Sequence, residues 1–380
     1  MNDKIEKIKQ LTTALNYHRK IYYNESKNEI SDYEYDTMFD ELKSLEDETG
    51  FILSNSPTQT VGYPINSKFD KVTHNKPLLS LNKTQDINEF IKFCSVNPVL
   101  LMHKLDGLTI HVEYRNGTIY KASTRGDGIT GDDITTNIKY FSNIPITVNN
   151  KDTFTVTGEA VIDRITFDNI NNSLPEDERF KNPRNLASGT VKQLDTSIVS
   201  SRNIKFLCWN ANDLSTDGTM LNGLDNANAL GFDTVTYYIP TTNLSESVPE
   251  CIETLKNNTN NIPIDGIVAM YNNIAFGESL GKTSHHFNNG FAFKFYDEEE
   301  ETTLTEIIWS MGKTGELCPV AIFNPVIIDG TTVTRASLHN ITVMTELLGK
   351  PYIGQHIWVK KSNMIIPKVT RAVKIDDLKE

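Results

Sequence analysis

A lysine and a carboxylate two positions apart are the side chains in this sequence best suited to covalent chemistry. They stand in Lys104-Leu105-Asp106-Gly107, which we interpret as the end of a β-strand. Side chains alternate along a strand, so Lys104 and Asp106 are expected on the same side, and Gly107 lets the backbone turn away behind them. A buried amine beside a carboxylate can form a covalent lysyl intermediate. Taken alone, the tetrapeptide is also compatible with a surface turn that carries an ordinary lysine.

Further charged and glycine-containing motifs accompany this tetrapeptide in a fixed order. Those that follow it are Thr124-Arg125-Gly126-Asp127-Gly128, Gly158-Glu159, Asn182-Pro183-Arg184-Asn185, Asp265-Gly266-Ile267-Val268 and Phe293-Lys294-Phe295. The flanking motifs are Ile30-Ser31-Asp32-Tyr33-Glu34-Tyr35-Asp36, Ser54-Asn55-Ser56-Pro57-Thr58-Gln59, Gly312-Lys313-Thr314-Gly315, Arg335-Ala336-Ser337-Leu338-His339-Asn340 and Ile366-Pro367. This ordered series resembles the nucleotidyltransferase motifs of NAD-dependent DNA ligases over nearly the whole chain.

The resemblance implies an α+β protein of three domains. It places a helical domain that binds nicotinamide mononucleotide (NMN) at residues 1–70 and a nucleotidyltransferase (adenylation) domain of antiparallel sheets with helices at 71–297. A C-terminal OB-fold β-barrel follows at 298–380. Bacterial relatives continue beyond this barrel with zinc, helix-hairpin-helix and BRCT modules. We therefore interpret the sequence as either a fragment or a naturally compact ligase, without a zinc site.

Local patterns in the sequence lead to the same elements. Apolar residues at helical spacing, such as Ile8 and Leu15, predict a first helix, and Ser31 with Glu34 forms a capping box for a second. Alternating segments at 109–114 and 118–124 flank Asn116-Gly117, which predicts a β-hairpin. A helix is expected at 185–194, and the strand-rich segment after 297 fits a small barrel.

The composition of the chain limits the kind of protein that it can be. No apolar run is long enough for a membrane span, and four cysteines without metal-ligand spacing are typical of a reducing cytoplasm. We expect a cytoplasmic monomer, bacterial or in a host cell if a phage or virus encodes it. The net charge of −12 by itself disfavours nucleic acid as a partner, because phosphate neutralisation supplies most of the affinity for DNA. A local basic surface is needed instead.

By resemblance, Lys104 attacks the α-phosphate of NAD, releases NMN and carries AMP. The AMP then passes to the 5′-phosphate of a nick in duplex DNA, and the 3′-hydroxyl displaces it. Phosphoryl transfer depends mainly on positioning and charge neutralisation. Asp106, Glu159 and Asp265 are the expected ligands of Mg²⁺ and ribose, since hard cations prefer oxygen. The expected phosphate partners are Arg125, Arg184, Lys192 and Lys294. Each of these charges could instead be a solvated surface group.

Three further groups of residues complete the expected nucleotide and DNA sites. Ser80, Leu81 and Trp209 align with the adenine pocket, although Trp209 is also compatible with a core position. NMN is expected to bind at Tyr22, Tyr23, Asp32, Tyr35 and Asp36, where carboxylates and aromatic faces suit a cationic ring. The alternative interpretation of Asp32 is that it caps the start of a helix and favours its dipole. DNA is expected at Arg125 and, on the barrel, at Arg335, Lys360 and Lys361.

Two pocket positions depart from the family pattern. Relatives commonly carry glutamate and lysine where this chain has Met102 and Met270. Losing both charges together leaves neither one buried without a partner. Adenine recognition must then rely on shape, stacking and backbone groups. The alternatives to an NAD-dependent DNA ligase are an ATP-dependent ligase or capping-type nucleotidyltransferase, disfavoured by residues 22–36, and a non-catalytic nucleotide- or DNA-binding accessory protein, disfavoured by the retained charged motifs.

Overall fold

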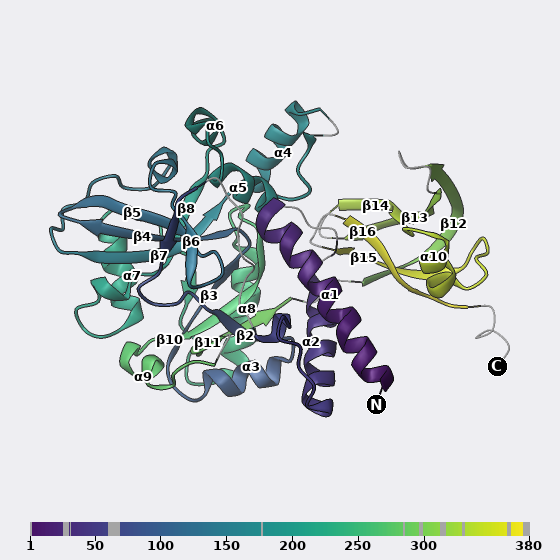
Figure 1. Cartoon of the computed structure of the whole chain (residues 1–380), viewed down its shortest axis with the longest axis horizontal. Coiled ribbons are helices and arrows are strands. Elements are labelled where there is room, and N and C mark those ends of the chain that lie inside the picture. Colours follow the sequence, from purple (N-terminus) through teal and green to yellow (C-terminus); the bar gives the residue numbers. More distant parts are fainter. Residues whose placement is uncertain are drawn as a thin grey trace. The chain divides into compact units, whose positions relative to one another are not determined.

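The chain folds into two compact units of mixed helix and strand. The computed structural model describes residues 2–25, 30, 32–59, 69–175, 178–283, 286–295, 299–311, 317–328, 331–362 and 366–374. One unit consists of Met1–Ile30 with Glu34–Phe295, and the other of Ser31–Tyr33 with Tyr296–Glu380. Figure 1 shows the elements of both. None of the helices in the described ranges is long and apolar enough to cross a membrane. The three domain boundaries expected from the sequence stay predictions.

The N-terminal segment forms the two helices that its apolar spacing predicts. They are α1 (Asn2–Glu25) and α2 (Asp32–Thr49), followed by the short helix η1 (Pro57–Gln59). Ile8, Leu11 and Leu15 of α1 are buried against Leu42 of α2. These three residues recur at three- and four-residue intervals, so they share one helical face. Ser31, and with it the expected capping box, lies outside the described residues.

A five-stranded sheet forms the centre of the first unit (Figure 1). Its order is β2 (Ser80–Thr84), β11 (His286–Lys294), β10 (Ile264–Tyr271), β3 (Val99–Leu105) and β9 (Tyr237–Tyr238). The β2–β11 pair is parallel and the others are antiparallel. Helices α3 (Ile87–Cys94) and α8 (Leu244–Asn257) pack with Leu101, Ile267 and Phe291 in one buried cluster. Because side chains alternate, residues such as Lys104 and Lys294 are left on the opposite face.

A four-stranded antiparallel sheet provides the second layer of strands. Its order is β5 (Thr118–Thr124), β4 (Leu108–Arg115), β7 (Phe154–Val161) and β8 (Lys205–Asn210). The β4–β5 hairpin confirms the prediction. Asn116 and Gly117 have positive φ angles of 55° and 77°, as a two-residue turn of this kind requires. The Tyr114 and Phe154 rings stack with centroids 5.1 Å apart in the core of this sheet.

The remaining elements of the first unit surround these two sheets. They are β1 (Lys71–Thr73), β6 (Thr130–Asp132), η2 (Asn137–Tyr140), α4 (Arg164–Ser173), α5 (Pro183–Val191), α6 (Thr196–Ser201), η4 (Asn212–Leu214), α7 (Met220–Ala229) and α9 (Ile274–Ser279). The helix expected at 185–194 begins earlier, because Asn182 caps its start, and ends earlier, because Asp195 caps the next helix.

The second unit contains the small barrel that the sequence predicts. Its closed order is β12 (Glu299–Met311), β13 (Leu317–Ile328), β14 (Thr331–Ser337), β16 (Ile366–Ala372) and β15 (His356–Ser362). Helix α10 (Ile341–Leu348) contributes Met344 and Leu348 to its core. Inward residues such as Phe323, Val333 and Val359 are buried, so the interior is filled by side chains.

Candidate active site

One face of the five-stranded sheet carries the expected nucleophile. Gly266 of β10 lies opposite Lys104 on β3 and opposite Lys294 on β11. Residues opposite one another in an antiparallel pair project to the same face, so both lysines flank this glycine on the side away from α3 and α8. A Cβ at position 266 would lie 2.2 Å from the carbonyl oxygen of Phe293. Glycine therefore allows the close backbone approach that brings the two amines together.

Asp265 links these amines electrostatically. The Lys104 Nζ atom donates to both carboxylate oxygens of Asp265, at 2.8 and 2.5 Å, and the Lys294 Nζ lies 3.9 Å from Asp265 Oδ2. Burial opposes ionisation of Asp265, but Lys104, Lys294 and then Arg184 outweigh it and lower the pKa of this carboxyl. The Asp265 carboxylate is therefore ionised, and both of its oxygens are hydrogen-bonded to the Lys104 Nζ.

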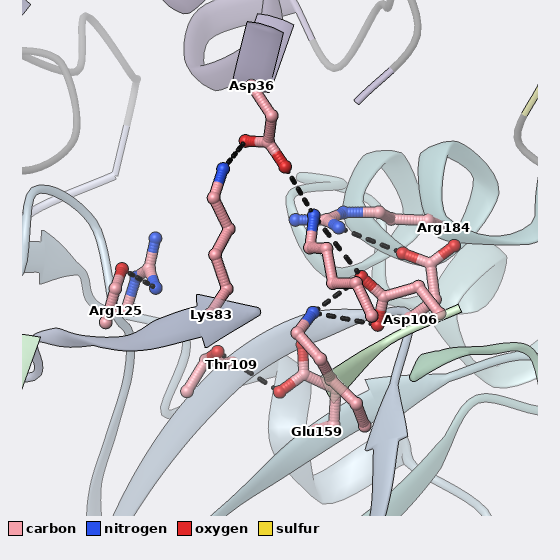
Figure 2. Close-up of polar contacts among 11 residues, drawn as sticks. Asp36, Lys83, Asp106, Thr109, Arg125, Glu159 and Arg184 are labelled. Atoms are coloured by element: carbon pink, nitrogen blue, oxygen red, sulfur yellow. Dashed lines mark hydrogen bonds and ion pairs between the residues drawn. The ribbon is translucent and has the colours of Figure 1, made fainter. Parts of the chain in front are cut away.

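Asp36 brings the N-terminal helices to the same site. Figure 2 shows its side chain reaching from α2 toward Lys83, and its Oδ1 lies 2.6 Å from the Lys83 Nζ. Its Oδ2 accepts a hydrogen bond of 2.8 Å from the Lys294 Nζ. Burial raises the pKa of Asp36, but Lys294 and Lys83 more than offset this and lower it, so the carboxylate is ionised. The expected NMN residue Asp36 thus meets the expected phosphate residue Lys294.

Asp106 is hydrogen-bonded to Arg184, whereas Lys104 is hydrogen-bonded to Asp265. The Arg184 guanidinium donates to Asp106 Oδ1 at 2.9 Å (Figure 2). Arg184 is presented by the first turn of α5, which the Asn182 cap orients. Gly107 is required for a reason other than the expected turn: a Cβ there would lie 2.3 Å from the carbonyl oxygen of Ala160 on β7. This glycine lets the end of β3 approach the four-stranded sheet.

Glu159 of β7 is a buried carboxyl group close to these charges. Desolvation raises its pKa to about 7, although several neighbours favour the charged form. Thr109 Oγ1 donates to Glu159 Oε2 at 3.1 Å, and the Trp209 side chain also hydrogen-bonds the carboxyl. The positive charges of Arg125 and Lys104 lower the pKa of Glu159, as these hydrogen bonds do, but they do not outweigh desolvation. Glu159 can therefore gain or lose a proton near neutral pH, and it can bind a hydroxyl or a cation.

The Thr124–Gly128 turn places Arg125 beside Ser80. Arg125 donates to Ser80 Oγ at 3.4 Å, so two residues expected at the nucleotide lie together. The backbone oxygen of Arg125 accepts from the Gly128 N–H at 3.0 Å. Gly126 has φ 59°, and a Cβ there would lie 1.9 Å from the carbonyl oxygen of Thr130. Only glycine fits this tight turn.

An apolar wall continues the same face of the sheet. Met102 and Met270 are almost fully buried and belong to one cluster, against which Leu81 and Trp209 pack. Val268 lies opposite Met102, so Met270, two residues further along β10, is its diagonal neighbour. Gly290 lies opposite Met270, and a Cβ there would lie 2.3 Å from the methionine sulfur. The predicted adenine-facing residues therefore lie together, and their side chains present no charge.

Other expected residues lie elsewhere or outside the described residues. Lys192 lies 3.9 Å from buried Asp132, which also pairs with Lys71 at 2.6 Å. Tyr35 stacks with Phe39 at 6.3 Å between centroids. The side chains of Tyr22, Tyr23, Asp32 and Lys361 are not described.

The barrel residues belong to the second unit and are described within it alone. Arg335 is exposed on β14, opposite Ile322. Lys360 of β15 is a buried residue, 9% exposed, and lies opposite Lys368 of β16. Arg335 is therefore accessible to a phosphate in this structure, whereas Lys360 must move to reach one.

Two site residues were missed by the sequence interpretation. Lys83 pairs with Asp36, and Thr109 donates to Glu159. A signal for Lys83 exists in the sequence, because it lies two strand positions after Leu81 and therefore shares its face of β2. Thr109 lies opposite Glu159 on adjacent strands, which only the β4–β7 register reveals.

The expected magnesium ligands do not form a ready-made metal site. Across the described ranges, no group of three or more His, Cys, Asp or Glu side chains could hold a metal ion. Asp265 is engaged by Lys104 and Asp106 by Arg184, while Glu159 has a raised pKa. These carboxyl groups therefore do not form a complete set of metal ligands by themselves.

Comparison with known proteins places the whole chain beside one family. Residues 66–298 match the NAD-dependent DNA ligase adenylation domain, residues 301–379 the OB-fold domain of the same ligases, and residues 1–62 the N-terminal NAD⁺-binding domain. A DNA ligase of Lachnoclostridium phytofermentans is 43% identical over 97% of this chain and 57% of its own length. One of Ruminiclostridium cellulolyticum is 42% identical over 97% and 56%. The chain thus spans little more than half the length of these relatives.

Proposed function

Because the chain belongs to the NAD-dependent DNA ligase family, we propose that it seals nicks between a 5′-phosphate and a 3′-hydroxyl in duplex DNA. The proposal covers activity, substrate and partner. The observation that carries it is the position of Lys104, whose amine is held by Asp265 within 3 Å and faces the same side of the sheet as Lys294.

In the first step, the Lys104 Nζ atom attacks the α-phosphorus of NAD. An N–P bond forms, the bond from that phosphorus to the bridging oxygen breaks, and NMN leaves with the bonding electrons. Only the unprotonated amine has the lone pair for this attack, and the nitrogen gives up a proton as the N–P bond forms. The Asp265 carboxylate, which is hydrogen-bonded to the Lys104 Nζ, is an acceptor within reach of that proton. Lys294 and Arg184 lie where they can neutralise phosphate charge, and arginine offers two parallel donors. Since phosphoryl transfer requires little covalent help from a protein, this positioning is the main catalytic contribution.

In the later steps, the AMP passes to the 5′-phosphate of the nick, and the 3′-hydroxyl then displaces AMP as the strand is joined. Arg125 lies beside Ser80, and both residues are proposed to contact the nucleotide. Arg125 is proposed to contact DNA as well. Arg335, Lys360 and Lys361 of the barrel are proposed to bind the phosphate backbone. These contacts are the local basic surface that an acidic chain needs.

NAD is proposed as the AMP donor in preference to ATP. The match of residues 1–62 to the NAD⁺-binding domain supports this choice, as does the reach of Asp36 from α2 to Lys294. Tyr22, Tyr23, Asp32, Tyr35 and Asp36 are the proposed NMN contacts. Ser80, Leu81, Met102, Trp209 and Met270 are proposed at adenine, with Lys192 a proposed phosphate partner.

The requirement for Mg²⁺ remains a proposal, together with a monomeric state and a place in the cytoplasm. Mg²⁺ is usually bound through one or two carboxylates together with substrate phosphates, rather than by a complete protein cage. Asp106, Glu159 and Asp265 are the proposed carboxylates.

The test is the intact mass of the protein after incubation with NAD or with ATP. A gain of one AMP from NAD alone is expected for the wild type, and Lys104→Ala should gain none. Lys76→Ala is a matched control, because the Lys76 side chain is 84% exposed and pairs only loosely with Glu278 at 3.5 Å. AMP labelling of the Lys104→Ala protein would refute the nucleophile. Labelling from ATP alone would support an ATP-dependent enzyme instead, and no labelling would favour an accessory protein.

A further inference from the structure

Asp36 is shared between two lysines, and this sharing has a consequence for the first chemical step. The Lys83 Nζ lies 2.6 Å from Asp36 Oδ1, and the Lys294 Nζ lies 2.8 Å from Asp36 Oδ2. The three side chains are 31%, 20% and 26% exposed for Lys83, Lys294 and Asp36 respectively. Each carboxylate oxygen therefore has its own cation in a partly desolvated setting, where ion pairs are stronger than on an open surface.

The strand register explains why the two lysines meet the same carboxylate. Lys83 lies opposite Ala292 in the parallel β2–β11 pair, and Lys294 follows Ala292 by two residues. Ala292 and Lys294 share a face because side chains alternate, so Lys83 projects to that face as well. Lys104 lies on the same face across β10. Asp36 of α2 thus contacts two of the three lysines on this face, Lys83 and Lys294.

Among the ion pairs of the described residues, Lys294 lies near two carboxylates, Asp36 and Asp265, and Lys83 lies near Asp36. Lys294 also lies 3.9 Å from Asp265, the partner of Lys104. It is therefore the lysine next to the reacting amine, while Lys83 contacts only Asp36 among the ion pairs of the described residues. A phosphate attacked by Lys104 must arrive beside Lys294 and compete with Asp36 for its ammonium group. If Lys294 turned to the phosphate and Lys83 were absent, the Asp36 carboxylate would lack both of these cations. Its negative charge would then repel the incoming phosphates.

We propose that Lys83 is a positioning residue that keeps the Asp36 carboxylate paired while Lys294 passes from Asp36 to the phosphate of NAD. This inference rests on the proposed function and extends it to a residue outside the recognised motifs. Lys83 acts through Asp36 and does not itself need to touch the reacting phosphorus. Its role is confined to the step in which the NMN half is present, because Asp36 belongs to the helices that are proposed to bind that half.

The inference predicts a dependence between Lys83 and Asp36 that a structural role would not produce. Lys83→Met removes the ammonium group and keeps most of the apolar stem. It should raise the KM for NAD about tenfold, which corresponds to about 1.4 kcal/mol. Lys83→Arg should restore most of the loss, because it returns the positive charge. In an Asp36→Asn background, Lys83→Met should change the KM for NAD less than twofold, because position 36 then has no carboxylate for Lys83 to pair with.

The experiment compares the wild type, Lys83→Met, Lys83→Arg, Asp36→Asn and the double variant Asp36→Asn/Lys83→Met. It measures single-turnover adenylylation over a range of NAD concentrations, and sealing of a nick that already carries AMP. Lys83→Met should slow the first reaction far more than the second. If Asp36→Asn reacts too slowly for its rate to be compared, calorimetry gives the dissociation constant of NAD for each protein. The effect of Lys83→Met with and without Asp36 is then compared in those constants. Equal effects of Lys83→Met with and without Asp36 would overturn the inference, as would equal losses on both reactions. A wild-type protein that takes no AMP from NAD would instead refute the proposed function.

Discussion

Met102 and Met270 offer the most direct test of the proposed adenine pocket. Met102 is 2% exposed and Met270 is 6% exposed, and they are diagonal neighbours on adjacent strands. Cross-strand diagonal positions are about 7–8 Å apart, which long side chains can span. Met102→Glu should place a carboxyl group in an apolar wall with no cation opposite it. Adding Met270→Lys should supply that cation.

The cost follows from the burial of Met102. Full desolvation raises a carboxyl pKa by up to about 3–5 units, and each unit is about 1.4 kcal/mol. Met102→Glu should therefore lower the free energy of unfolding by about 4 kcal/mol at pH 8. The folded state would hold the proton more firmly than the unfolded state, so the loss should shrink as the pH falls toward about 4. The second substitution should recover about 1–3 kcal/mol, as coupled neighbours do.

The assay is urea denaturation of the wild type, both single variants and the double variant at pH 5 and pH 8, together with NAD-dependent adenylylation rates. Met102→Glu should slow adenylylation, and the double variant should be faster than Met102→Glu alone. Wild-type protein should also accept NAD analogues altered on the adenine edge, because Met102 and Met270, the residues proposed to face adenine, carry no charge. Strict additivity in both measurements would mean that the two side chains do not meet, and the assignment of this wall would be wrong.

Glu159→Gln should stabilise the protein by up to about 3 kcal/mol at pH 8 and leave it unchanged at pH 4, because burial raises the pKa of Glu159 from 4.5 to about 7. The wild-type protein then loses stability as the pH rises from 4.5 to about 7, where only the unfolded state gives up the proton, and the loss is complete above that range. Urea melts at both pH values test this, and a gain independent of pH would contradict it. Asp32→Ala with Tyr35→Ala should cripple adenylylation from NAD and spare sealing of a pre-adenylylated nick; equal losses on the two substrates would assign α2 another role. Changing Lys360 and Lys361 to Ala should reduce the salt slope of DNA binding by about 1–2 and impair nick sealing more than adenylylation. An unchanged slope in a binding titration would remove these lysines from the DNA contact.

The motif order in the sequence was enough to identify the family, and it is also the basis on which Lys104 is proposed as the nucleophile. The helical pair, the β4–β5 hairpin and the C-terminal barrel were also predicted correctly. Each of these depends on short-range patterns: helical spacing, strand alternation and the Asn116-Gly117 turn. Such patterns involve residues that are close together in the chain, so they can be recognised without knowledge of the tertiary contacts.

Which charges meet was decided only by the tertiary structure. Lys104 and Asp265 are 161 residues apart in the chain, and Lys294 and Asp36 are 258 apart. Their pairing follows from the register of β10 between β3 and β11 and from the approach of α2, which no local pattern specifies. Lys83 went unnoticed for this reason, and the proximity of Lys192 to Asp132 was not foreseen either.

The sequence by itself therefore determined the family, the element types and the chemistry available to Lys104. The partner of each charge, the pKa of Glu159 and the exposure of Arg335 and Lys360 came from the fold. The physical reason is that a side chain's chemistry is carried by its residue type. Its desolvation and its ion pairs, in contrast, depend on neighbours that distant segments supply.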